Sequence, residues 1–273
     1  MISIQIGASV AKQLFPVIGV TETTALRLCL AAIMLSLVHH PWKGKLNRKD
    51  LISVFLYGIS LGFMNLFFYL SLERIPLGVV VPLEFIGPLI ITVYNSKYKS
   101  DFIWISLAVL GVALFLPVIE TTEQLDLIGI LFALGGGLCW AVYIVFGKRA
   151  GTSLDSGKTT ALGMGIGALV VLPFSLFSSG LDALTLEILP LSLIVAIFSS
   201  ALPYSFEMIA LKKIPPHIFG VLLSIEPVFA AFFGFFFLNE CLSWLQIFAI
   251  ILIIVACFGA ALPKDDKSTL RTE

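Results

Sequence analysis

Charged residues are scarce in this chain. Its 273 residues contain 17 lysines and arginines, 17 aspartates and glutamates and 3 histidines, and the formal net charge is zero. A chain without excess positive charge lacks the basic surface that nucleic-acid binding requires. The histidines, His39, His40 and His217, lie at the ends of apolar runs, and the sequence contains no HExxH motif. We therefore expect no metal site and no enzyme.

The four cysteines show no pattern typical of metal or redox chemistry. Cys29, Cys139, Cys241 and Cys257 lie in or beside apolar runs, without the close pairing of a zinc site or a CxxC motif. We expect them to pack as small apolar residues and predict no cofactor. The first hydrophobic stretch has no basic leader and no cleavage site, so we interpret it as mature structure rather than a signal peptide.

Apolar residues are abundant, at 59% of the chain. This is more than one soluble core can bury, so lipid must surround most of the chain. Crossing a bilayer takes about 20 apolar residues. Runs near this length predict ten transmembrane helices, at residues 1–18, 22–39, 51–72, 77–96, 102–119, 127–147, 159–178, 189–211, 216–238 and 243–262. The predicted fold class is an all-α integral membrane protein.

The basic residues indicate the orientation. If the loop at 40–50 is cytoplasmic, strict alternation places fourteen basic residues on the cytoplasmic side and only Arg74 outside, while Lys12 and Arg27 fall within spans. One helix more or fewer would destroy this asymmetry, which therefore supports the span count. We predict a multi-pass protein of the cell inner membrane with both termini in the cytoplasm.

The two halves of the chain repeat each other. The residues Lys12, Thr23, Thr24, Ala25 and Leu26 recur 136 positions later, and Leu72, Ile75, Pro76 and Pro88 recur 139 positions later as Leu211, Ile214, Pro215 and Pro227. Each half holds five predicted helices, an odd number, so the second half must be inverted relative to the first. We assign the repeats to 1–119 and 126–263, and a cytoplasmic tail to 264–273. By comparison with the second repeat, about ten residues are expected to be missing from the first helix.

Four segments resemble a known family of transporters. They are YGISLGFMNLFFYLSLERIPLGVVVPLEFIGPL, GGGLCWAVYIVFGKRAG, SSALPYSFEMIALKKIP and SIEPVFAAFFGFFFLNE, and EFxGP and LPYSxEMIAL are their most specific motifs. The chain resembles the EamA type of the drug/metabolite transporter superfamily, and within it the threonine and homoserine exporters. The resemblance covers nearly the whole chain. It implies ten helices, a central cavity, and efflux of a small amino acid driven by the proton gradient.

Charged residues within spans are costly, so by default they face the bundle interior and mark a pathway. Glu84 and Glu226 lie nearest the middle of the bilayer and close to one another in the repeat alignment. They are predicted to line the cavity, or else to pair with a hydroxyl or with Arg27. Arg27 is expected either to hold a substrate carboxylate or to neutralise a buried glutamate. Lys12 is interpreted as an interfacial lysine.

Glu207 lies near the predicted internal end of its helix, so it could serve the pathway or simply extend to cytoplasmic water. Tyr204 lies one turn before it, in a polar stretch that includes Pro203. A proline there leaves a carbonyl without its helical donor, which could bind a substrate ammonium or only kink the helix. The predicted spans contain these three glutamates but only two basic residues, so at least one carboxylate has no cation to balance it. A carboxyl in low dielectric can take up a proton near neutral pH, as a proton antiporter requires.

Uncharged polar residues complete the candidate pathway. Asn65, Tyr69 and Tyr143 are candidate hydrogen-bonding groups in the cavity or between helices, and Trp140 is a candidate cavity wall or interfacial anchor. Gly58 with Gly62, Gly163 with Gly167, and the run 135–137 predict close helix packing.

Two classes compete with a transporter of amino acids and protons. An intramembrane enzyme lacks a motif here, and a channel usually relies on a ring of subunits or a filter sequence. Another amino acid, a nucleoside or a xenobiotic remains an alternative substrate. The sequence does not indicate an oligomeric state.

Overall fold

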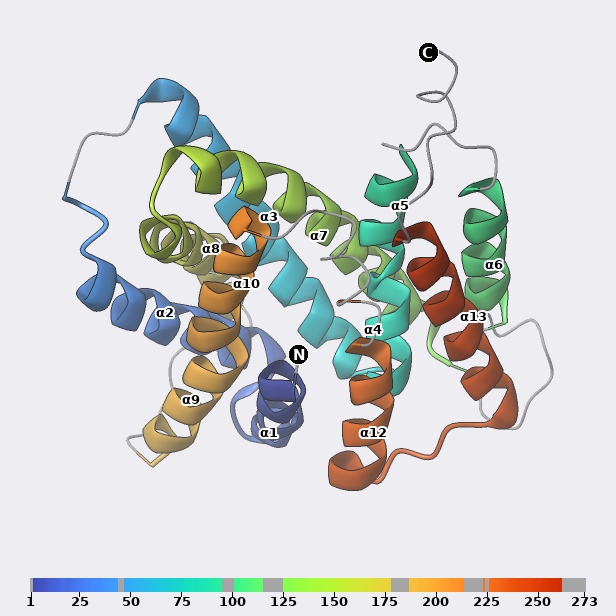
Figure 1. Cartoon of the computed structure of the whole chain (residues 1–273). Helices are drawn as coiled ribbons and strands as arrows, with labels where there is room; N and C mark the ends of the chain where they lie inside the picture. Colours follow the sequence, from blue (N-terminus) through green and yellow to red (C-terminus); the bar gives the residue numbers. More distant parts are fainter. Residues whose placement is uncertain are drawn as a thin grey trace, which may run out of the picture.

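The structure is a computed structural model that describes residues 2–43, 47–94, 101–114, 125–177, 187–213, 223 and 226–261 (Figure 1). Over these residues it consists of helices without strands, which confirms the predicted all-α class. The helices are α1 (Ile2–Ile18), α2 (Val20–His39), α3 (Arg48–Leu72), α4 (Leu77–Glu84), α5 (Ile86–Tyr94), α6 (Asp101–Ala113), α7 (Leu127–Ser153), α8 (Ser156–Phe177), α9 (Leu189–Ala196), the π-helical η1 (Ile197–Ala201), α10 (Leu202–Lys213), α12 (Glu226–Leu238) and α13 (Trp244–Ala261). The tail at 264–273, His217 and the repeat residues Ile214 and Pro215 lie outside the described residues.

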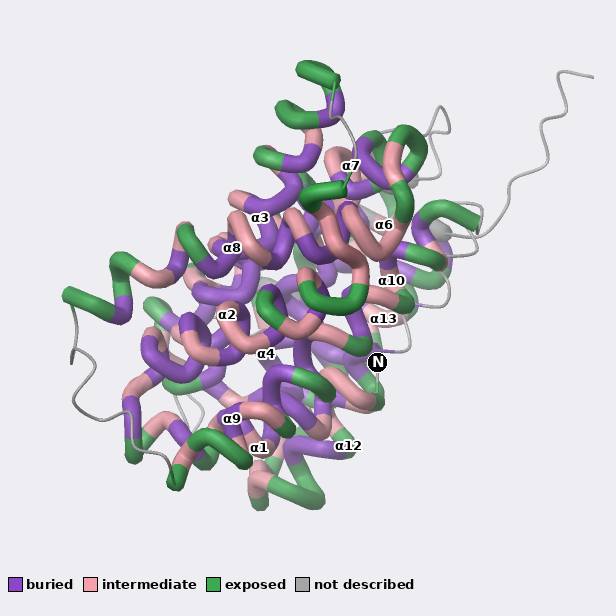
Figure 2. Tube along the Cα trace, turned by 90° about the vertical axis from the view of Figure 1, so that its left-hand side faces the viewer, coloured by how far each residue is buried: buried purple, intermediate pink, exposed green. Residues whose placement is uncertain are grey.

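Each of the ten predicted spans contains at least one of these helices. By length and composition, α2, α3, α7, α8 and the continuous segment from α9 to α10 are long and apolar enough to cross a membrane. The outward faces are also apolar, because Phe232, Phe235, Phe236 and Phe237 on α12 are all more than half exposed. Exposed residues lie mainly along the outer faces of the bundle in Figure 2. The chain is therefore a multi-pass membrane protein.

The contacts between helices follow the repeat predicted from the sequence. In that repeat, α1 corresponds to α7 and α3 corresponds to the segment from α9 to α10. α3 packs along α7 and against α8, while α9 and η1 pack against α1 and α2 in the matching way. Helices at the same position in the two halves also pair, as α2 does with α8, α4 with α12 and α6 with α13. Figure 1 shows α3 and α7 crossing between α2 and α8 on one side and α5, α6 and α13 on the other. The exact repeat boundaries stay a prediction.

Glycines bring α3 and α8 together. A Cβ atom on Gly58 would lie 3.0 Å from the carbonyl oxygen of Gly163, and one on Gly62 would lie 2.8 Å from that of Gly167. These are the two glycine pairs that the sequence marked for close packing, and the structure places them against each other. The close approach holds α3 in position, so the side chains on its other faces reach the centre of the bundle.

The repeated threonines have the same role in both halves. The hydroxyl of Thr24 donates to the carbonyl of Val20 at 2.8 Å, and that of Thr160 donates to the carbonyl of Ser156 at 2.9 Å. Both residues are completely buried. Because each hydroxyl is satisfied within its own helix, these threonines serve the α2–α8 interface.

Two membrane segments are interrupted near their middle. α4 ends at Glu84 and α5 begins at Ile86, where Pro88 has no N–H to donate to the carbonyl of Glu84. Between α9 and α10 the chain forms the π-helical turn η1, where Pro203 likewise cannot donate to the carbonyl of Ser199. Broken helices are tolerated inside a membrane where they face protein or a cavity. Both interruptions lie beside the cavity described below.

Candidate substrate cavity

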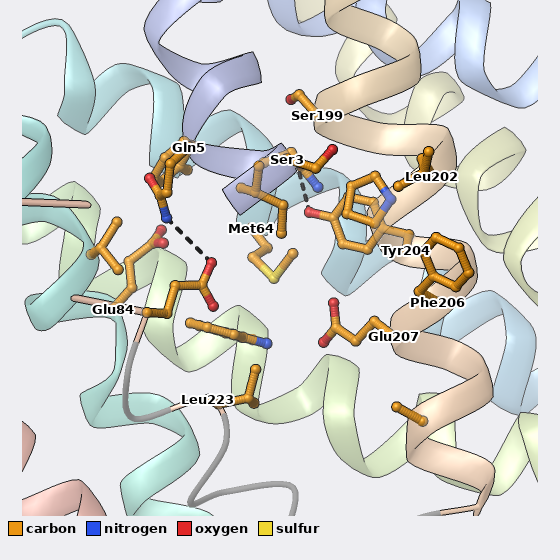
Figure 3. A pocket seen from close by; sticks show the side chains of 18 of the residues that line it. Ser3, Gln5, Met64, Glu84, Ser199, Leu202, Tyr204, Phe206, Glu207 and Leu223 are labelled. Atoms are coloured by element: carbon orange, nitrogen blue, oxygen red, sulfur yellow. Dashed lines mark hydrogen bonds between the residues drawn. The ribbon is translucent and has the colours of Figure 1, made fainter. Parts of the chain in front are cut away.

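A cavity of about 360 Å³ lies among α1, α3, α4, α7 and α10. This is near the lower end of the volumes typical of small-molecule sites, about 300–1,000 Å³. Its lining residues are Ser3, Ile4, Gln5, Arg27, Met64, Asn65, Phe68, Val81, Glu84, Trp140, Ser199, Leu202, Pro203, Tyr204, Phe206, Glu207, Ala210, Leu223 and Glu226. In Figure 3, Gln5 and Glu84 lie on one side of the cavity, Tyr204 and Glu207 on the other, and Met64 between them.

Seven of the nine candidate pathway residues line this cavity. They are Arg27, Asn65, Glu84, Trp140, Tyr204, Glu207 and Glu226. Tyr69 and Tyr143 instead lie behind its wall and are completely buried. The ring of Tyr143 packs 4.9 Å from that of Tyr57 and 6.0 Å from that of Tyr204. The two tyrosines therefore support the wall rather than face the cavity.

The lining follows the internal repeat. Several lining residues form pairs at equivalent positions of the two halves: Ile4 with Trp140, Met64 with Pro203, Asn65 with Tyr204, Phe68 with Glu207 and Glu84 with Leu223. Each pair is 136 or 139 positions apart, as in the repeat itself. Equivalent backbone positions of the two halves thus both contribute to the cavity wall, while the side chains at these positions differ. The cavity is symmetric in construction and asymmetric in chemistry.

Arg27 is the centre of a hydrogen-bond network. Its Nη2 donates to Oδ1 of Asn65, and its Nη1 donates to Oγ of Ser199 and, at 3.1 Å, to the Ser199 carbonyl. The guanidinium also lies over the ring of Tyr69, 4.4 Å from its centroid. Tyr204 donates to the same Asn65 oxygen at 3.0 Å. Arg27 therefore forms no hydrogen bond with a glutamate among the described residues. It links α2, α3 and η1 and places a fixed positive charge on the cavity wall.

This network also uses the carbonyl that Pro203 frees. The sequence left open whether that carbonyl binds a substrate ammonium or merely accompanies a kink. In the structure it belongs to Ser199 and accepts from Arg27. The broken helix thus serves to position the arginine, because an unsatisfied carbonyl inside a membrane would cost several kcal/mol.

Glu84 stands at the interruption between α4 and α5. Its side chain is buried, and its Oε1 has no hydrogen-bond partner among the described residues. Two glycines of α7 make room for it. A Cβ atom on Gly136 would collide with that Oε1, and one on Gly137 would lie 2.5 Å from the Glu84 carbonyl oxygen. A buried carboxyl with an unpaired oxygen is well placed to hold a proton, because the charged form is costly there.

The other two intramembrane glutamates reach the same cavity. Glu226, the first residue of α12, is buried and accepts from Nε2 of Gln5 at 3.3 Å (Figure 3). Glu207 lines the opposite wall, and its Oε1 is buried without a hydrogen-bond partner among the described residues. Glu207 therefore faces the cavity, which was one of the two expectations for it. Trp140 also forms a wall, with its ring 4.9 Å from that of Phe85.

The charges that line the cavity are unequal. Among the described residues, the lining contains three carboxyl groups and one guanidinium, and its other members are uncharged. Three ionised carboxylates beside one cation would be costly in a low-dielectric site. Protonation of a carboxyl or arrival of an ammonium group relieves this imbalance. The charge of the described lining thus suits a ligand that carries positive charge.

Polar links join α3 to the start of α7 at the end of the bundle that was predicted to be external. The hydroxyl of Ser71 donates to the carbonyl of Gly129 at 2.8 Å, and Arg74 forms an ion pair with Asp126 at 2.8 Å. The hydrogen bond from Arg74, with a further one from the backbone N–H of Ile128, holds the pKa of Asp126 below its usual range. The cavity lining, in contrast, extends along α10 to Ala210, toward the predicted cytoplasmic end. The cavity lining thus extends away from these links and toward the end that was predicted to be cytoplasmic.

Sequence reasoning missed two groups at or near the cavity. Gln5 was passed over because it is an uncharged residue within an apolar run, where a polar side chain gives a weak signal. Glu240 was passed over because it lies in a short connection between helices, where an acidic residue is normally solvated. In the structure it forms an ion pair with Lys12, 2.8 Å away. Only the fold brings together residues so distant in sequence.

Comparisons with known proteins agree with this architecture. Residues 127–262 match the model of the EamA-like transporter family. The threonine/homoserine exporter RhtA of Salmonella typhimurium (strain SL1344) is 46% identical over 263 residues, 96% of this chain and 88% of that protein. RhtA of Escherichia coli K12 is 43% identical over 271 residues, 99% of this chain and 92% of that protein. A crystal structure with 16% identity covers 93% of both chains with a TM-score of 0.60, which shows a shared fold.

Proposed function

Because the chain belongs to the EamA family of the drug/metabolite transporter superfamily, we propose that it exports threonine, homoserine or a closely similar amino acid across the cell inner membrane. One observation supports this most: Arg27 and three glutamates line a single cavity of about 360 Å³. An amino acid carries a carboxylate and an ammonium group, so it matches a wall with one fixed cation facing several carboxyl groups.

The contacts suggest how such a substrate would bind. The Nε group of Arg27 has no partner among the described residues, whereas both Nη groups are engaged. Nε is itself buried, so a substrate carboxylate would reach this donor only after neighbouring side chains move on binding. The ammonium group would lie toward Glu84 or Glu226, whose carboxyl groups are buried at the cavity wall. The small volume favours a compact side chain such as that of threonine or homoserine.

We propose proton antiport by alternating access. A carboxyl that holds a proton in one state can release it when an ammonium group takes its place, so one site serves both cations in turn. Glu84 and Glu226 are the best candidates because they are the deepest carboxyl groups. An inverted repeat is suited to this cycle, since it allows two equivalent conformations that face opposite sides.

Purified protein in proteoliposomes tests this proposal. Counterflow of radiolabelled homoserine measures exchange without net proton movement, and accumulation driven by an imposed pH gradient measures coupling. The wild type should perform both. We expect Glu84→Gln or Glu226→Gln to reduce gradient-driven accumulation at least tenfold while one of the two variants retains counterflow. Glu73→Gln, at an exposed turn, is the matched control and should behave as the wild type.

Two outcomes would contradict the proposal. Folded wild-type protein that moves neither homoserine nor threonine would exclude these substrates and leave another metabolite or a drug. Transport that is unaffected by a protonophore and by both glutamate variants would exclude proton antiport. Flux that does not saturate with substrate would indicate a channel.

The proposed orientation can be tested with a native cysteine. Cys241 is exposed and lies between α12 and α13, on the side proposed to be periplasmic, whereas Cys29, Cys139 and Cys257 lie within helices. A membrane-impermeant maleimide is expected to label intact cells through Cys241, and Cys241→Ser should abolish this labelling. In that background, Thr152→Cys on the opposite side should react only after the membrane is opened. The reverse pattern would show that the termini are outside.

A further inference from the structure

Glu240 ties the two halves together at the end of the bundle proposed to be external. Its Oε1 accepts from Nζ of Lys12 at 2.8 Å, and its Oε2 accepts from the backbone N–H of Leu77 at 2.8 Å. Both donors belong to the first half and Glu240 belongs to the second. The Glu240 side chain is only 10% exposed, although it lies in a short connection between helices. One carboxylate thus holds α1 and α4 against the segment that follows α12.

The surroundings strengthen this contact. Leu77 is the first residue of α4, and its N-cap, Pro76, provides no side-chain acceptor. The carboxylate of Glu240 supplies that acceptor from another part of the chain and meets the positive end of the helix. The carboxylate lies close to α12. A Cβ atom on Gly234 would lie only 2.5 Å from its Oε2, so glycine leaves the space that the carboxylate occupies. Separating the halves at this end would leave the α4 N-terminus uncapped and the ion pair broken.

The repeat provides a second pair of the same kind. Lys12 corresponds to Lys148, 136 positions later. Glu240 corresponds to Asp101 at the offset of 139 that relates Pro88 to Pro227, and to the neighbouring Ser100 at the offset of 140 that relates Trp104 to Trp244. With Asp101 as the counterpart, both positions keep their charge, although the surrounding sequence differs. Lys148 lies near the proposed cytoplasmic end of α7, is exposed, and forms no ion pair with the residues that the structure describes. Asp101 is the first residue of α6.

We infer that the pair Lys12–Glu240 is the external gate, closed in this structure, and that Lys148 and Asp101 form its counterpart at the cytoplasmic end. This inference rests on the alternating access proposed above. The cavity extends toward the proposed cytoplasmic end, and the pair at the opposite end is formed. When the cavity turns outward, the inverted repeat exchanges the roles of the two ends, so Lys12–Glu240 separates and Lys148 meets Asp101.

Cysteine reporters can test both gates in a background without native cysteines. Ala230→Cys reports on the external side, since Ala230 is completely buried on α12, which packs against α1 and α4. Ala210→Cys reports on the cytoplasmic side, since Ala210 lines the cavity. Labelling rates with an impermeant maleimide are measured in right-side-out vesicles for the first reporter and in inside-out vesicles for the second.

Opposite effects are expected from the two gates. Glu240→Gln should raise external labelling of the Ala230→Cys reporter about tenfold and lower labelling of the Ala210→Cys reporter, because the outward-facing population grows. Lys148→Gln should shift both rates in the opposite direction. Lys12→Arg keeps the ion pair and should leave the rates unchanged. Asp126→Asn breaks the exposed ion pair at the same end and is the matched control, with little expected effect.

The labelling result does not depend on the substrate. Unchanged rates in both Glu240→Gln and Lys148→Gln would overturn the gate assignment, even if homoserine is transported. Shifts of the same sign in both variants would also overturn it, because they would indicate general loosening. Glu240→Gln could be tested only if it folds. Lys148 forms no ion pair with described residues, so Lys148→Gln should fold normally and keeps the test valid even if Glu240→Gln fails to fold. Shifted labelling without homoserine transport would keep the gates and reject the substrate.

Discussion

Arg27→Gln is expected to abolish transport and to destabilise the protein by about 3 kcal/mol. The substitution removes the donors to Asn65 and to Ser199, all of them buried. Buried acceptors left without a donor keep their full desolvation cost, so the loss exceeds that of an exposed hydrogen bond. Arg27 is the only cation among the described residues that line the cavity, so its loss should also leave the carboxyl groups there uncompensated.

Homoserine counterflow and thermal unfolding in detergent measure the two effects separately. Arg27→Lys keeps the charge but cannot reach Asn65 and Ser199 at once, so it should recover stability only in part and counterflow by no more than about a tenth. Arg74→Gln is the matched control. Its ion pair with Asp126 is more than one-third exposed on both sides, and such pairs contribute about 1 kcal/mol or less. Normal counterflow by Arg27→Gln would exclude Arg27 from the site.

Gly87→Ala is expected to prevent the normal packing of α5 on α7. A Cβ atom at this position would overlap the carbonyl oxygen of Gly137 and approach its Cα to 3.0 Å. The obstacle is backbone rather than a flexible side chain, so the helices must move apart. Overpacking of this kind costs about 3 kcal/mol. It would also displace Glu84, three residues earlier, and we expect transport to fall at least tenfold.

Gly165→Ala provides the control for this substitution. Nothing lies within 4 Å of a Cβ atom at Gly165, which is within α8. Alanine favours a helix over glycine by about 1 kcal/mol, so the control should be as stable as the wild type or slightly more stable. Thermal unfolding and counterflow of both variants check the prediction. Equal unfolding temperatures for the two would show that α5 and α7 are not in close contact.

The internal repeat explains why much of the fold was predictable. Length and apolar content alone indicate membrane helices, because no soluble core could bury so many apolar residues. The matches between Lys12 and Lys148 or Pro88 and Pro227 then predict two related halves. The sequence predicts the two helix breaks less directly than the repeat. Pro88 and Pro203 predict a lost donor, but neither shows which group satisfies the carbonyl that is freed.

The candidate site was partly predictable for a related reason. Charges inside a membrane are rare and costly, so Glu84, Glu226 and Arg27 stand out in a single sequence. Neutral polar residues do not, because they are common in packed helix interfaces. Asn65 and Tyr69 looked alike in sequence, yet Asn65 lines the cavity and Tyr69 supports Arg27 from behind. Small differences in helix rotation separate these roles, and the sequence does not encode them locally.

The sequence by itself determined that this chain is a membrane protein of apolar helices in two related halves, and that few charges lie within it. These properties follow from local chemistry, since burial of charge and exposure of apolar surface are decided residue by residue. The tertiary structure alone decided the partners: Arg27 with Asn65 and Ser199, Glu226 with Gln5, and Lys12 with Glu240. Residues far apart in sequence meet only after the helices have packed, so contacts between them depend on the whole fold.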